Sequence, residues 1–196
     1  MTDDTDGAPA DVADPRPVLA SQVVFSGRVW GVRQDTVDLG AGGTVVRDYI
    51  SHPGAVAVLA VDEQDRVLVV HQYRHPVGEV LWEIPAGLCD HEGEPAEQTA
   101  LRELWEETHH RAERVEPLIE VYLSPGSSSE LLQVFLAHGV RPADDEPHPA
   151  HEEEHGMPVA WQPLDVIVDG IFAGRLRNPS LVLGVLALLA RRSRTA

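Results

Sequence analysis

Acidic side chains recur at helical spacing between residues 81 and 110, and they define the chemistry that this chain could perform. Glu103 and Glu107 are four residues apart, so on an α-helix their carboxylates lie on one face. Two like charges at this spacing destabilise a helix by about 0.2–0.5 kcal/mol unless a cation offsets them. Hard cations such as Mg²⁺ take oxygen ligands, often a few carboxylates together with the phosphates of a substrate. The spacing therefore favours metal-assisted chemistry on a phosphate compound.

The same segment has the apolar periodicity of a short helix. Its apolar stripe consists of Ala96, Ala100, Leu101, Leu104 and Trp105. Pro95 suits the first helical turn, where a missing N–H costs nothing, and Glu94 beside it is a candidate cap. Arg102 and Glu106 share the face that adjoins the stripe. The simplest alternative is an acidic helix face that only contacts water.

A longer pattern distinguishes the segment from an ordinary acidic helix. Glu94 is separated by seven residues from the run RELWEE, which occupies positions 102–107. With Gly87, this arrangement resembles the Nudix box, G-x5-E-x7-R-E-U-x-E-E-x-G-U, where U is aliphatic. The flanking sequence WEIPAG at residues 82–87 is similar to the ADP-ribose pyrophosphatase branch of the Nudix hydrolases.

Two departures from the box bear on its geometry. Six residues, not five, separate Gly87 from Glu94, and His109 stands where the box has glycine. Glycine just after a helix commonly adopts a left-handed backbone, which costs a residue with a β-carbon about 1 kcal/mol. Because histidine tolerates that region better than most residues, we expect the change at His109 to be accommodated.

The resemblance implies a role for each residue of the box. Glu103 and Glu107 would hold Mg²⁺ or Mn²⁺, with Glu106 assisting and the Ala86 carbonyl a candidate further ligand. The metal would neutralise a pyrophosphate and lower the pKa of a bound water. Arg102 would orient the carboxylates through charge-assisted hydrogen bonds.

Other segments supply candidate substrate contacts. Arg74, in the sequence QYRHP, follows a predicted buried strand, and the similar enzymes use this arginine on the substrate, although a surface salt bridge is the alternative. Glu83 of WEIPAG and Glu130 are further candidates for substrate binding, and Glu130 could instead support residues that touch the substrate. Glu130 ends the loop 124–130, which resembles an S-P-G-x-S-D-E element of ADP-ribose pyrophosphatases. Ser129 replaces the aspartate of that element, which weakens the ADP-ribose assignment more than the Nudix assignment.

Two flanking regions carry further candidates. By composition alone, we expect residues 142–154 to form a mobile acidic loop. The resemblance instead gives a glutamate of this loop, Glu153 or Glu154, the role of general base or extra metal ligand. N-terminal strands of the similar enzymes help to build a homodimer and a purine pocket. Trp30 and Tyr49 are therefore candidates for stacking on adenine, with ordinary sheet packing as the alternative.

The elements around these residues predict one ordinary domain with additions. We expect a disordered acidic tail (1–19), a strand unit (20–52) and a hydrolase domain (53–194). Valine-rich runs at 55–61 and 66–72 predict a buried hairpin, 115–123 and 131–137 predict strands, and 164–173 and 178–189 predict helices. The resemblance implies an α/β (α+β) fold, a Nudix-type α/β/α sandwich with a mixed sheet and an N-terminal antiparallel strand unit.

Composition excludes several other functions. A formal net charge of −17 argues against nucleic-acid and anionic membrane partners. All 15 basic residues are arginine, which excludes Schiff-base and P-loop lysines, and a single cysteine excludes an internal disulfide. With neither a signal peptide nor a membrane-length apolar run, we expect a cytoplasmic protein.

The sequence thus predicts a metal-dependent hydrolase of a nucleoside diphosphate linked to another group, foremost ADP-ribose going to AMP and ribose 5-phosphate. Its alternatives are a Nudix hydrolase of another nucleoside diphosphate sugar or dinucleotide, a non-catalytic nucleotide-binding regulator, and a purely structural acidic protein.

Overall fold

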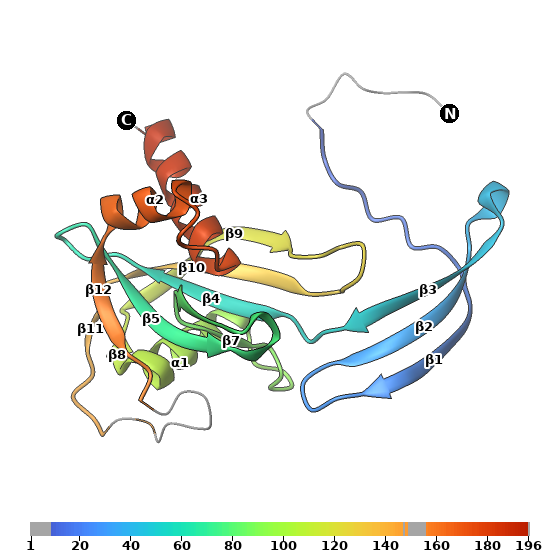
Figure 1. Cartoon of the computed structure of the whole chain (residues 1–196), viewed down its shortest axis with the longest axis horizontal. Coiled ribbons are helices and arrows are strands. Elements are labelled where there is room, and N and C mark those ends of the chain that lie inside the picture. The colour runs from blue at the N-terminus through green and yellow to red at the C-terminus, as the bar shows by residue number, and fades with distance from the viewer. Residues whose placement is uncertain (1–8, 147, 149–155, 196) are drawn as a thin grey trace. The chain divides into compact units, whose positions relative to one another are not determined.

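The structure, a computed structural model, describes residues 9–146, 148 and 156–195 (Figure 1). It divides into two compact units, of which the first ends at Ser51 and the second begins at His52.

The first unit is an antiparallel sheet in the order β1-β2-β3 (Figure 1). Its elements are β1 (Val18–Ser26), β2 (Gly31–Asp38), the 3₁₀ turn η1 (Gly40–Gly42) and β3 (Thr44–Ser51). Val18 pairs with Val37, so the sheet begins inside the predicted tail, because an apolar Val18-Leu19 pair extends the strand. Residues 1–8 of that tail lie outside the described residues. Every residue of β1 is exposed, including its apolar members Val18, Leu19, Val23, Val24 and Phe25.

The second unit contains a mixed sheet, ordered β7-β4-β10-β9, and an antiparallel sheet, ordered β12-β5-β6. In the mixed sheet β4 and β10 run parallel, and β7 and β9 run antiparallel to their neighbours. The strands are β4 (Ala55–Ala60), β5 (Arg66–Arg74), β6 (Glu79–Glu83), β7 (Ala86–Leu88), β9 (Arg114–Tyr122), β10 (Leu131–His138) and β12 (Val159–Pro163). The remaining elements are η2 (His75–Val77), α1 (Ala96–Thr108), β8 (His110–Arg111) paired with β11 (Arg141–Pro142), α2 (Leu164–Phe172) and α3 (Pro179–Thr195).

The predicted hairpin of residues 55–61 and 66–72 is wrong in its pairing. β4 bonds to β7 and β10, whereas β5 bonds to β6 and β12. Within the described residues, an isolated bridge between Val61 and Val67 is the pairing that joins the two runs. Both strands are apolar on both faces, so each can occupy the interior of its own sheet. The predicted burial is correct, since Val56 and Val69, for example, are at most 1% exposed.

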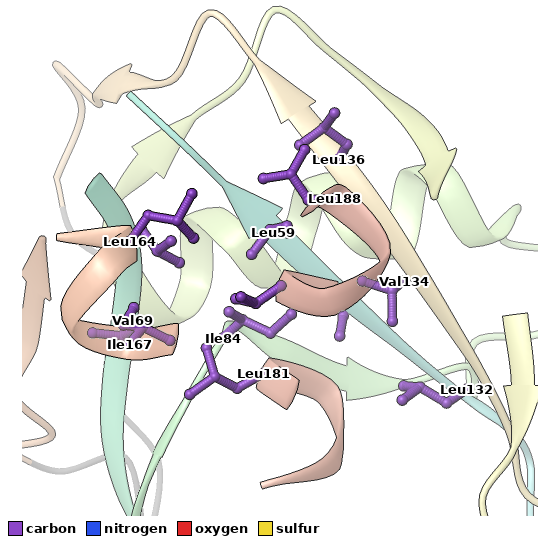
Figure 2. Packing of buried hydrophobic residues seen from close by; sticks show 13 residues of the cluster. Leu59, Val69, Ile84, Leu132, Val134, Leu136, Leu164, Ile167, Leu181 and Leu188 are labelled. Carbon is purple, nitrogen blue, oxygen red and sulfur yellow. The ribbon is translucent and has the colours of Figure 1, made fainter. Parts of the chain in front are cut away.

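Hydrophobic side chains pack on both faces of the mixed sheet because successive residues of a strand point to opposite faces. Along β4, Leu59 joins a cluster covered by α2 and α3, through Ile167 and Leu181 among others (Figure 2). The opposite cluster includes Ala100 and Leu104 of α1, both fully buried. Complete burial of one leucine side chain contributes about 1.5–3 kcal/mol. The result is the expected α/β/α sandwich with a mixed sheet.

The C-terminal helices follow the predicted pattern, with α2 ending at Phe172 and α3 continuing beyond its predicted end to Thr195. Of the helices in the described ranges, none has the length and apolarity needed to cross a membrane.

Candidate active site

Helix α1 packs one face on the sheet and carries its acidic residues on another. Its buried residues are Thr99, Ala100, Leu104 and Thr108. The helix begins after Pro95, whose backbone is extended and whose carbonyl accepts the N–H groups of Gln98 and Thr99. Glu94 is not a cap, contrary to expectation, because Thr99 and Arg102 attract its carboxylate. The Thr99 hydroxyl donates to Glu94 at 2.9 Å.

The Arg102 guanidinium joins three carboxylates. Its Nε and one terminal nitrogen donate to Glu94 at 3.2 and 3.0 Å. The other terminal nitrogen donates to Glu103 at 2.6 Å and to Glu106 at 2.9 Å. The bonds to Glu94 raise the pKa of Arg102 further above its ordinary value, and the same bonds lower the pKa of Glu94. Arg102 therefore stays charged and fixes the direction in which these carboxylates point.

Glu103 and Glu107 lie against strand β7. A β-carbon on Gly87 would fall 2.0 Å from the carboxyl carbon of Glu103, so the strand needs glycine at this point. Glu107 accepts the Ala86 N–H at 3.0 Å. Because Gly87 pairs with Val56 of the buried strand β4, the core holds this backbone in place. The structure thus brings the Ala86–Gly87 backbone and two carboxylates of α1 together.

A cavity of about 560 Å³ adjoins this backbone, and its walls include Arg74, Glu83, Ala86, Gly87 and Glu130. Arg74 donates from Nε to Glu83 at 2.9 Å and from a terminal nitrogen at 2.6 Å. Glu83 is only 1% exposed, and a bidentate pair of this kind fixes the plane of the guanidinium. Glu83 therefore orients Arg74 at the cavity.

Comparison of the sequence with known proteins identifies the family to which this chain belongs. A model of the NUDIX domain matches residues 51–180. The chain belongs to the Nudix family. The expectation of a Nudix hydrolase is thereby confirmed.

The chain is similar to two Nudix relatives named ADP-ribose pyrophosphatase. The protein from Mycobacterium tuberculosis (strain ATCC 25618 / H37Rv) is 38% identical over 172 residues, covering 88% of this chain and 82% of the relative. The protein from Bacillus subtilis (strain 168) is 42% identical over 119 residues, covering 61% of this chain and 64% of the relative. A solved structure described as an ADP compounds hydrolase superposes with a TM-score of 0.76 at 17% identity, covering 95% of this chain and 99% of that one. This last likeness confirms the Nudix-type fold.

Nudix hydrolases generally need a divalent metal, and the donor chemistry of the box fits one. Glu103, Glu106 and Glu107 provide hard carboxylate oxygens on one helix, and Glu103 and Glu107 lie against the Ala86–Gly87 backbone that lines the cavity. As the side chains stand, Glu103 and Glu106 face Arg102, and Glu107 faces the Ala86 N–H. Among the described residues, no three His, Cys, Asp or Glu side chains already converge as a preformed metal site.

The loop 124–130 connects β9 to β10 and places Glu130 in the cavity wall. The Ser128 hydroxyl accepts the Glu130 N–H at 3.1 Å. Ser129, the departure from the family element, accepts the His52 N–H on its hydroxyl at 3.0 Å. The serine thus fastens the loop to the segment that leads into β4.

The other four predicted site residues belong to the first unit or fall outside the described residues. Trp30 and Tyr49 belong to the first unit, where the Trp30 ring tilts against Phe25 at 6.1 Å and the Tyr49 hydroxyl contacts Asp35 at 3.0 Å. Glu153 and Glu154 lie outside the described residues.

Two further residues of the box region behave as their chemistry predicts. His109 ends α1 in a left-handed conformation, with φ of 54°, and its N–H bonds to the Trp105 carbonyl at 2.8 Å. His109 therefore takes the position that glycine has in the box, and it still provides the left-handed C-cap of α1. Burial raises the pKa of the Cys89 thiol, which leaves it a poor nucleophile.

Sequence reasoning missed His52 and the start of α3 as walls of the cavity. Asn178 accepts the Leu181 N–H on its side chain at 3.1 Å, which caps α3 beside the cavity. The sequence Asn-Pro-Ser predicted the start of a helix, but it gave no sign that this start lines the cavity. For His52, the available signal was the sequence His-Pro-Gly immediately before a buried strand.

Proposed function

We propose that this Nudix protein hydrolyses ADP-ribose to AMP and ribose 5-phosphate. Water attacks one phosphorus of the pyrophosphate, the bridging P–O bond breaks, and the two monophosphates leave. The observation that carries the proposal is the box itself: Arg102 gathers Glu94, Glu103 and Glu106, and Glu103 lies against Gly87 in the wall of the 560 Å³ cavity. The 38% identity to an ADP-ribose pyrophosphatase over 88% of the chain supports the choice of substrate.

Glu103 and Glu107 would hold Mg²⁺ or Mn²⁺, with Glu106 and the Ala86 carbonyl as further ligands. When bound, the metal would neutralise the charge of the pyrophosphate and lower the pKa of a water molecule. Arg102 keeps the carboxylates in place, and Gly87 leaves the space that Glu103 occupies.

Arg74, held by Glu83, would bind a substrate oxygen, because the guanidinium is a planar fork of donors matched to phosphate. Glu130, also in the cavity wall, would contact the substrate as well. Either Glu153 or Glu154 would serve as the general base or as an extra metal ligand, and separate glutamine substitutions would identify which one.

Hydrolysis of another nucleoside diphosphate sugar or dinucleotide is the second candidate, favoured by the serine at position 129. Purified protein with Mg²⁺ or Mn²⁺ would be given ADP-ribose, ADP-glucose, GDP-mannose, NADH and diadenosine polyphosphates. We expect AMP and ribose 5-phosphate from ADP-ribose, with the highest kcat/KM of the panel. A different best substrate selects the second candidate, and binding without any cleavage selects the regulator.

We also propose a cytoplasmic homodimer in which a second copy covers the apolar side chains exposed on β1, with Trp30 and Tyr49 contributing to the adenine site. A sheet with this much exposed apolar surface is typical of an interface. Phe25→Asp should shift the sedimentation mass from two chains to one.

A further inference from the structure

A hydrogen bond to the backbone sets both the orientation and the tautomer of the His52 imidazole. Its Nδ1 accepts the Gly54 N–H at 3.1 Å. A ring nitrogen that accepts a hydrogen bond carries no proton, so the proton of the neutral ring is on Nε2. Nε2 is therefore a hydrogen-bond donor on the side of the ring away from the backbone bond.

The backbone of His52 is anchored as well. Its N–H donates to the Ser129 hydroxyl at 3.0 Å, and its carbonyl accepts from the same hydroxyl at 3.4 Å. The next residues lead directly into β4, where the Gly54 carbonyl accepts the Cys89 N–H at 3.2 Å. The ring thus stands on a rigid support, and binding through Nε2 requires little ordering of the protein.

His52 and Glu130 both line the 560 Å³ cavity. The His52 imidazole offers an N–H donor, and the Glu130 carboxylate offers an acceptor. A sugar hydroxyl can bond to both, because it accepts hydrogen bonds and donates one. Beside the Glu130 carboxylate a neutral sugar hydroxyl is a better partner than a phosphate, because two negative charges repel each other.

We propose that His52 binds the sugar that is released from the nucleotide, by donating Nε2–H to one of its hydroxyl oxygens. The proposal rests on the proposed function and adds to it a residue that selects the sugar. Ser129 acts in it as a positioning residue, which gives the serine at this place a role in substrate choice.

Two substitutions distinguish the roles of the two ring nitrogens of His52. In His52→Asn the side-chain oxygen can still accept the Gly54 N–H, but nothing replaces Nε2. In His52→Gln the amide nitrogen reaches the Nε2 position. Loss of one hydrogen bond predicts that His52→Asn raises KM for ADP-ribose about three- to tenfold, with kcat within about twofold of wild type, and that His52→Gln restores much of the loss.

Calorimetry without added metal provides the second readout. ADP-ribose should bind His52→Asn more weakly by the same factor, whereas AMP, which lacks the distal sugar, should bind both proteins equally. Equal weakening for AMP and ADP-ribose, or unchanged binding of both, would overturn the proposal. Ser129→Ala keeps the ring intact and should weaken ADP-ribose binding in the same selective way, which guards against misfolding of the His52 variants.

Failure of the proposed function has a separate signature. If wild-type protein cleaves another nucleoside diphosphate sugar and not ADP-ribose, the substrate assignment fails. The same variants, measured with that compound and its nucleoside monophosphate, then decide the role of His52. If wild-type protein binds no nucleoside diphosphate sugar, both proposals are wrong.

Discussion

Arg102 is the residue on which the geometry of the box depends most. Its fork reaches Glu94, Glu103 and Glu106 together. Arg102→Lys keeps the charge but cannot bridge three carboxylates, because an ammonium lacks the planar spread of donors. Since the side chain is mostly buried, at 22% exposed, we expect the free energy of unfolding to fall by about 1–2 kcal/mol. We expect kcat to fall at least tenfold.

Urea unfolding and steady-state kinetics would check this prediction. Arg177→Lys is the matched control, because Arg177 pairs with Glu79 at an exposed position. That control should change stability by less than about 0.5 kcal/mol. Equal effects of the two substitutions would show that Arg102 forms only an ordinary ion pair.

The contact between β7 and α1 shapes the site. Gly87→Ala would place a methyl group 2.0–2.5 Å from the Glu103 carboxylate, which must then move. The atoms displaced are the flexible end of a side chain, so we expect the fold to survive while kcat falls by an order of magnitude or more.

A double-mutant cycle tests this mechanism. If Gly87→Ala acts through Glu103, adding it to Glu103→Ala should cost little further activity. Full additivity of the two losses would contradict the account. Thermal unfolding of each variant would show whether the sheet itself is intact.

Across the whole molecule, Glu116 links the mixed sheet to the C-terminal helix. The Arg114 guanidinium of β9 contacts Glu116 at 2.9 Å, and Arg191 of α3 contacts it at 2.5 Å. Arg114 first, and Arg191 with it, lower the pKa of Glu116 from 4.5 to about 2. The unfolded chain therefore takes up this proton before the folded one, and the stability from Glu116 is lost as the pH falls from 4.5 to about 2.

This predicts that Glu116→Gln is less stable than wild type at pH 7 and that the difference shrinks between pH 4.5 and about 2. Urea midpoints measured across this range, with Glu120→Gln on the exposed part of the same strand as control, would check it. A gap that stays constant down to pH 2 would contradict the assignment.

The elements were largely predictable from local pattern, and their partners were not. The periodicity of residues 96–108 determined α1, and valine-rich runs determined β4 and β5. The sheet that each strand joins depends on pairing with β10 and β12, more than 70 residues away along the chain.

The same limit applies to the site. The box motif predicted Arg102 and the glutamates by their spacing. The pairing of Arg74 with Glu83, and the contact of Ser129 with His52, follow from folding and have no signature in the sequence.

The most direct test of the account compares Glu107→Gln with wild type in the hydrolysis of ADP-ribose. Glutamine can still accept the Ala86 N–H, so the fold should persist, but it lacks the charge that holds a divalent cation. Glu97→Gln, at an exposed position of the first turn of α1, is the control. We expect AMP and ribose 5-phosphate from wild type and from the control, and a loss of kcat by orders of magnitude in Glu107→Gln. Full activity in that variant would contradict the site.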